Sequence, residues 1–167
     1  TVLSAIGGKT SGAVTVTNAI TITGSTAELT AAMIGASSVV AASAKLTASP
    51  TGMTDDQLAA LDATTTGIIT ATLATGGVAD FANMTDANTN NVITVNINGS
   101  GSFAATLLSA IGGKTSGVVT ATTVITITGT TAQLTAALVT ADTLVVAQAA
   151  VIGTISDSSS ATLTAAN

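Results

Sequence analysis

The chain has 167 residues, of which 47% are hydrophobic, 1% aromatic and 7% charged, and its net charge at pH 7 is −5. It contains no Cys, His, Trp or Tyr, so catalysis by His or Cys, zinc sites built on those residues and disulfides are all excluded, and we expect no enzyme activity. Three lysines, no arginine and eight acidic residues disfavour binding to nucleic acid or to anionic lipid head groups.

The composition also predicts an ordered chain without a membrane span. Val, Ile, Leu and Thr are abundant and charge is scarce, which is the opposite of a disordered segment. A membrane-spanning helix needs about 20 consecutive apolar residues, and here Thr, Ser, Asn or Gly soon interrupts every apolar run. Thr1 is not preceded by Met and no targeting signal follows it, so we expect a processed chain or a segment of a longer one.

Five segments follow one plan, in which a strand that alternates Thr with Val or Ile leads through a glycine turn into a short Ala/Leu-rich helix. The plan predicts strands over 20–23, 45–48, 68–75, 92–98 and 124–128. It predicts helices over 27–33, 55–61, 78–84, 103–111 and 132–138. The turn glycines are Gly24, Gly52, Gly76, Gly99 and Gly129, which gives a unit of about 26 residues.

A longer repeat contains the short one. Residues 1–40 align with residues 106–145 at an offset of 105, with 27 of the 40 positions identical. The sequence therefore predicts a first long repeat over 1–105, made of about four short units, and a partial second repeat over 106–167. No linker separates the two.

A unit of this size cannot bury its own apolar face, but stacked units bury one continuous core. We therefore expect a β-rich repeat solenoid, in which coils of roughly 26 residues stack into a parallel sheet. The alternative is tandem Ig-like β-sandwich repeats of about 105 residues, against which the helical segments and the inner period argue. Both ends fall inside a unit and show no capping sequence, so we expect neighbouring repeats or identical subunits to cover them.

One acidic segment suggests a metal site. Asp86, Asn88 and Asn90 copy the opening of an EF-hand calcium loop, but Asn91 stands where that loop needs Gly and Ile97 stands where it needs Glu. The EF-hand is therefore excluded. An irregular calcium site remains a prediction, with Asp80, Asp86, Asn88 and Asn90 as its candidate ligands.

Asp55, Asp56 and Asp62 form a second set of candidate calcium ligands. The alternative is that they are solvated acidic residues of a loop, or that Asp55 caps a helix. A carboxylate-only enzyme, such as a glycosidase, would need two of these residues, or of Asp80 and Asp86, to converge in an open cleft.

The Gly-Lys-Thr triplets at Lys9 and Lys114 resemble the end of a phosphate-binding loop. Leu3 and Leu108 occupy the position of the first glycine that such a loop requires. We therefore predict loop lysines at corners of the coil and no nucleotide site. Asn83 and Asn98 begin triplets that fit the N-glycosylation pattern.

Thr-x-Thr pairs recur along the chain. On a strand, residues i and i+2 share a face, so stacked coils could align these threonines as in β-solenoid ice-binding proteins, which they resemble. The alternative is that Thr is a strand former on a wet face. The pairs are Thr15/Thr17, Thr21/Thr23, Thr70/Thr72, Thr120/Thr122 and Thr126/Thr128.

The runs ITITGSTAELTAAM, VTVTNAITITG and LVVAQAAVIGTISDSSSATLTAA resemble the Ala/Thr-rich repeats of very large secreted surface proteins of cyanobacteria and proteobacteria. The resemblance implies an extracellular or cell-surface location and a non-enzymatic role, and it carries over no functional residues. We expect a structural segment of a self-assembling filament, sheath or S-layer, whose partners are identical subunits or neighbouring repeats and cell-surface glycans. The alternatives are a calcium-stabilised adhesin array and an ice-binding solenoid.

Overall fold

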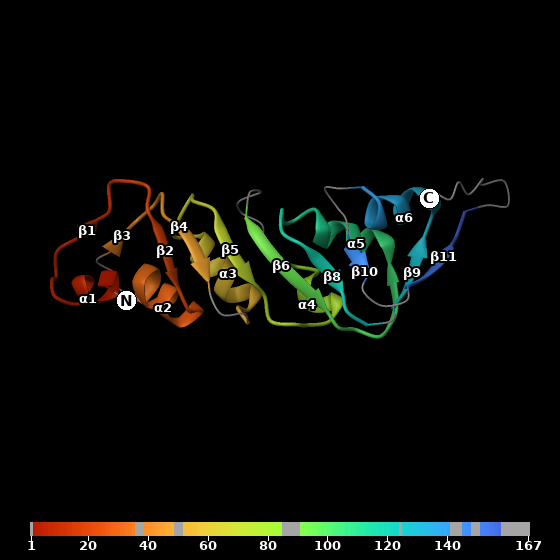
Figure 1. Cartoon of the computed structure of the whole chain (residues 1–167), viewed down its shortest axis with the longest axis horizontal. Helices are drawn as coiled ribbons and strands as arrows, with labels where there is room; N and C mark the ends of the chain where they lie inside the picture. Colours follow the sequence, from red (N-terminus) through yellow and green to blue (C-terminus); the bar gives the residue numbers. More distant parts are fainter. Residues whose placement is uncertain are drawn as a thin grey trace. The chain divides into compact units, whose positions relative to one another are not determined.

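The structure is a computed structural model that describes residues 2–35, 39–48, 52–84, 91–123, 125–140, 145–147 and 151–157. It has an α/β fold in which short helices alternate with short strands, and every strand pair in these ranges is parallel (Figure 1). Chain contacts divide it into two compact units. Among the described residues, unit 1 comprises those up to Ala74, residues 91–95 and Thr115–Gly117. Unit 2 comprises Thr75–Met84, Asn96–Lys114 and the residues from Val118 onward.

Unit 1 is built around a parallel sheet of four strands. Its strands are β1 (Val14–Thr15), β2 (Thr21–Gly24), β3 (Val39–Val40), β4 (Lys45–Ala48), β5 (Ile69–Thr72) and the first part of β6 (Val92–Ile97). Its helices are α1 (Val2–Gly7), α2 (Thr26–Thr30), the π-helical turn η1 (Ala31–Gly35) and α3 (Asp55–Asp62). The order β2-β4-β5-β6 forms the sheet, and β1 pairs separately with β3 (Figure 1).

Unit 2 contains two groups of parallel strands. Its helices are α4 (Val78–Phe81), α5 (Ala105–Gly112) and α6 (Thr131–Leu138). Its strands are β7 (Gly101–Ala104), β8 (Val119–Ala121), β9 (Ile125–Gly129), β10 (Val145–Ala147) and β11 (Val151–Ile155). The order β7-β9-β11 forms one group, and β8 pairs with β10.

The sequence separation between paired strands is nearly constant. In unit 1, Thr21 pairs with Lys45, Leu46 with Ile69, and Thr70 with Val92, so the partners lie 24, 23 and 22 residues apart. In unit 2, Gly101 pairs with Ile125, and Ile125 with Val151, at 24 and 26 residues. In unit 1 each of these strands therefore pairs with the strand of the next predicted short unit. In unit 2 the partners of β9 are β7 and β11, which the short units did not predict.

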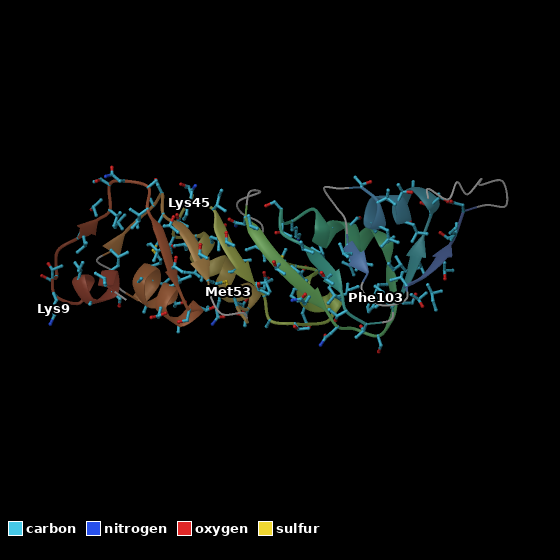
Figure 2. All side chains as sticks on the ribbon, in the orientation of Figure 1. Lys9, Lys45, Met53 and Phe103 are labelled. Atoms are coloured by element: carbon cyan, nitrogen blue, oxygen red, sulfur yellow. The ribbon has the colours of Figure 1, made fainter. Side chains whose placement is uncertain are left out.

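Alternation along the strands decides which side chains are buried. Ile22, Leu46, Ile69 and Ile93 are buried, and the threonines between them face outward or are half-buried. The helices add buried leucines from α2 and α3, and Met53, labelled in Figure 2, is fully buried in the loop before α3. Aliphatic side chains thus fill a core that contains few aromatic rings.

The helices begin with a repeated capping arrangement. At α2 the Glu28 backbone N–H donates to Ser25 Oγ at 3.3 Å, and the Ser25 N–H donates back to Glu28 Oε2 at 2.9 Å. The same reciprocal pair starts α3 with Thr54 and Gln57, and α6 with Thr130 and Gln133. A Cβ on Gly24, just before the cap of α2, would lie 3.1 Å from the same Glu28 oxygen, which is closer than an ordinary van der Waals contact.

The predicted strand and helix segments coincide with β2/α2, β4/α3, β5/α4, β6/α5 and β9/α6. Some boundaries are wrong. Phe103 lies in β7 and not in a helix, and α5 begins only at Ala105. The helix predicted to end at Met84 ends at Phe81, and the strand predicted to end at Thr75 ends at Thr72. The Ig-like alternative is also wrong, since such a sandwich is antiparallel and the described pairs are parallel.

Candidate functional site

The first candidate calcium set is placed only in part. Asp80 is exposed in the first turn of α4, where its Oδ2 accepts the Gly77 N–H at 2.7 Å. It therefore serves as a helix cap. Asp86, Asn88 and Asn90 lie outside the described residues, so the calcium site that they would complete stays a prediction.

The second acidic set occupies the two ends of one helix. Asp55 and Asp56 lie in the first turn of α3, where negative charge is favourable, and Thr54 is the N-cap. Asp62 is the last residue of the same helix and is buried. Across the part of the chain that the structure describes, no three His, Cys, Asp or Glu residues form a group that could hold a metal ion.

Asp62 belongs instead to a buried polar network in unit 1. The Asn91 Nδ2 group donates to Asp62 Oδ1 at 2.8 Å, and Asn91 Oδ1 accepts the Ile69 N–H at 2.8 Å. Asn91 is 3% exposed and Asp62 is 6% exposed. A single amide side chain thus joins the end of α3 to the start of β5, and both of its polar ends are satisfied.

Lys114 has a structural role in unit 2. Its Nζ donates to the Met84 carbonyl at 2.7 Å and to the Ala82 carbonyl at 3.3 Å, just after α4 ends at Phe81. A lysine near a helix C-terminus stabilises such carbonyl groups. Lys9, its equivalent at the offset of 105, is exposed, and its side chain extends away from the ribbon in Figure 2.

A contact that the sequence prediction missed occurs just after each of these lysines and once more elsewhere in the chain. We call it the Thr-x-Gly turn. It occurs at Thr10–Gly12, Thr65–Gly67 and Thr115–Gly117. In each one the threonine Oγ1 accepts the N–H of the glycine two residues later, at 2.9, 3.0 and 2.9 Å respectively.

Two of the three turns bind the backbone of the preceding strand region. Thr65 Oγ1 lies 2.6 Å from the Ala44 carbonyl oxygen, and the Thr66 N–H donates to the Ala42 carbonyl at 2.7 Å. The turn at Thr115 repeats this contact. Its Oγ1 lies 2.9 Å from the Ile93 carbonyl oxygen, and the Ser116 N–H donates to the Asn91 carbonyl at 3.0 Å. Each turn thus donates hydrogen bonds to two backbone carbonyl groups that lie two residues apart in the chain.

The glycine of the turn is required by this close approach. A Cβ on Gly67 would lie 2.1 Å from the Ala44 carbonyl oxygen, and one on Gly117 would lie 2.4 Å from the Ile93 carbonyl oxygen. The repeated triplet in the sequence was a signal that could have found the turn. Its partners could not be identified there, because they lie more than 20 residues earlier in the chain.

The threonine pairs are aligned only in part. Thr23, Thr47 and Thr70 are register partners on β2, β4 and β5, so they form a row across three strands. Val92 continues the row on β6, and Lys45 stands beside Thr21 in the neighbouring row. The row is therefore short and is bounded by other side chains.

Two carboxylates, the exposed Glu28 and the half-buried Asp157, make stability depend on pH. The pKa of Glu28 is lowered by hydrogen bonds from the Ser25 backbone and side chain, and that of Asp157 by hydrogen bonds from the Thr131 side chain and backbone. A carboxylate with a depressed pKa in the folded state adds stability above its unfolded pKa and loses it as the pH falls through the folded pKa.

We therefore expect the urea midpoint to decrease as the pH falls below the ordinary carboxyl values of 4.5 for Glu and 3.8 for Asp. The variant Glu28→Gln/Asp157→Asn should weaken this dependence. Gln at position 28 retains the capping arrangement, as Gln57 and Gln133 do. Identical pH profiles for the variant and the unsubstituted chain would contradict this prediction.

In the described ranges, no helix is long and apolar enough to span a membrane. Comparison of the chain with protein family models, curated proteins and solved structures found no match.

Proposed function

We propose that this chain is a non-enzymatic structural repeat segment of an extracellular, self-assembling surface filament, sheath or S-layer. In this proposal successive units of 22 to 26 residues are the coils of a solenoid. Coil stacking is then both the folding mechanism and the assembly mechanism.

The constant register offset carries the proposal. In a solenoid each strand pairs with the same strand of the next coil, so the separation of partners equals the coil length. The side-chain hydrogen bonds keep the same spacing: Thr122 donates to the Ile97 carbonyl 25 residues away, and Thr123 to the Gly99 carbonyl 24 residues away.

The surface supports association. Only 7% of the residues are charged, and a surface with little charge gives weak protection against self-association. Large apolar side chains are also exposed, among them Val2, Val118 and Val139 at 75%, 56% and 63%. Exposed apolar groups together with unpaired strand edges favour pairing with another chain.

The experiment is sedimentation velocity of the 167-residue chain over a range of concentrations, combined with electron microscopy, in calcium and in chelator. We expect oligomers that grow with concentration and unbranched filaments or sheets. If chelator dissolves them, calcium is a stabilising ligand and the adhesin-array alternative gains support. A monodisperse monomer in both conditions would contradict self-assembly.

A second candidate function is ice binding, which the row Thr23, Thr47 and Thr70 favours. Neighbouring strands of a sheet lie about 4.8 Å apart, so the row presents regularly spaced hydroxyl and methyl groups. Thermal hysteresis of the chain that is lost in Thr47→Lys would support this candidate, and the absence of hysteresis would exclude it.

A further inference from the structure

The chain contains a single Asn-Gly pair, Asn98–Gly99, which lies in the loop between β6 and β7. β6 ends at Ile97 and β7 begins at Gly101, whose φ of +137° lies in the region that favours glycine. Asn98 is exposed and Gly99 is half-buried. The pair belongs to unit 2, as do the residues that bind it.

Hydrogen bonds hold this loop from two sides but leave its reactive groups unbound. The Asn98 N–H donates to the Gly76 carbonyl at 2.9 Å, and Thr123 Oγ1 donates to the Gly99 carbonyl at 2.5 Å. Within the described ranges, no group binds the Asn98 side-chain amide or the Gly99 N–H. The Asn98 Cγ atom and the Gly99 nitrogen are therefore free to approach each other.

The other asparagines that the structure describes differ from Asn98 in at least one of these properties. Asn91 is 3% exposed, and both ends of its amide are hydrogen-bonded. Asn96 is half-buried within β6. Asn18 and Asn83 are exposed, but Ala and Met follow them, and a Cβ on the next residue restricts the approach of its backbone nitrogen. Among the described asparagines, exposure and a following glycine thus coincide only at Asn98.

Packing requires the glycine that makes this asparagine reactive. A Cβ on Gly99 would lie 3.1 Å from Cζ of Phe103, which is labelled in Figure 2. That distance is closer than an ordinary van der Waals contact, so a larger residue would have to displace the ring. The fold therefore keeps a glycine directly after an exposed asparagine.

We propose that Asn98 is a site of spontaneous deamidation, which converts it to aspartate and isoaspartate and loosens the loop. The Gly99 nitrogen attacks Asn98 Cγ, a C–N bond forms, and the side-chain nitrogen leaves as ammonia with the proton of the Gly99 N–H. The product is a cyclic succinimide. Water then opens the ring at either carbonyl group and gives aspartate or isoaspartate. This inference does not depend on the proposed self-assembly.

The reaction changes both the charge and the backbone of the loop. Either product adds one negative charge to a chain whose net charge is −5 at pH 7. Isoaspartate also adds a carbon atom to the main chain between the Asn98 nitrogen and the Gly99 carbonyl, which Gly76 and Thr123 hold in place. We expect these two hydrogen bonds to lengthen or break, so the modified chain is less stable than the original one.

The test is incubation of the 167-residue chain in neutral and in mildly alkaline buffer, followed by peptide mass spectrometry and labelling with an isoaspartyl methyltransferase. We expect Asn98 to react about 10-fold faster than Asn18 or more, because only Asn98 precedes glycine. The rate should rise with pH, because the attacking nitrogen must lose its proton. Equal rates at the two residues would overturn the proposal. So would a chain in which Asn98 reacts only in urea, because the fold would then protect the site.

Two variants separate the site from its consequence. Asn98→Gln keeps the amide but would have to form a larger ring, so it should stay unmodified and keep its urea midpoint during the same incubation. Freshly prepared Asn98→Asp carries the added charge without the added main-chain carbon, so its midpoint should lie above that of the incubated chain. Methyltransferase labelling of Asn98→Gln equal to that of the unsubstituted chain would overturn the site. An unchanged midpoint of the modified chain would overturn the loosening of the loop.

Discussion

Replacing Gly67 with Ala is expected to destabilise the chain by about 3 kcal/mol, the upper end of the usual cost of overpacking, because the site cannot relax. The new Cβ would lie 2.1 Å from the Ala44 carbonyl oxygen and 2.6 Å from its carbonyl carbon. Main chain cannot rotate away as a flexible side chain can, so the turn must move and its hydrogen bonds to Ala42 and Ala44 must lengthen. Gly117→Ala should cost a similar amount, since its Cβ would lie 2.4 Å from the Ile93 carbonyl oxygen.

The matched control is Gly12→Ala, measured at a concentration where the chain is monomeric. It makes the same substitution in the same triplet, and we expect a change within about 0.5 kcal/mol. Urea denaturation of the three variants gives the comparison. Equal losses in all three would mean that the glycine matters for the turn itself and not for the strand against which it packs.

Replacing Asn91 with Ala is expected to cost about 3 kcal/mol, because it leaves two buried polar groups without their partner. The Asp62 carboxylate loses the donor that lies 2.8 Å away, and the Ile69 N–H loses its acceptor. Water cannot easily replace the amide where Asn91 is 3% exposed. The measurement is the urea midpoint of the variant against the unsubstituted chain.

A double-mutant cycle separates this network from simple loss of packing. Asp62→Ala/Asn91→Ala should cost less than the sum of the two single variants, because the double variant no longer buries an unpaired carboxylate. Asn98→Ala, at an exposed asparagine, is the control and should change stability by less than about 0.5 kcal/mol. Additive losses in the cycle would contradict the account of a coupled network.

The strand and helix segments were predictable because their signals are local. The alternation through Ile20 to Thr23 predicts a strand with one buried face, and the structure buries Ile22 in β2. Likewise the Ala/Leu pattern after Thr54 predicts a helix, and α3 buries Leu58 and Leu61. The glycines between these segments predicted the turns that join them.

Short strands were missed because two or three residues carry no periodic signal. β1 and β3 have two residues each, and β8 and β10 have three. β7 was assigned to the helix that follows it, because apolar Phe103 continues the pattern of α5. Register between partners, and not the local sequence, defines these strands.

The contacts between residues far apart in the chain were missed for a related reason. The Thr-x-Gly turn and the pair of Asp62 and Asn91 join residues 21 to 29 positions apart. The sequence displays the triplet and the polar residues, but not the backbone that they reach. Asp62 was predicted as a candidate calcium ligand, and the structure instead gives its carboxylate an amide donor.

Fibre diffraction from aligned assemblies of the chain tests the stacked-coil account most directly. If coils stack within and between chains, strands lie across the fibre, and a reflection near 4.8 Å should fall on the fibre axis. The rise per chain should then be a whole-number multiple of that spacing. Assemblies whose strand spacing lies perpendicular to the fibre axis, or that show no strand spacing, would contradict the account.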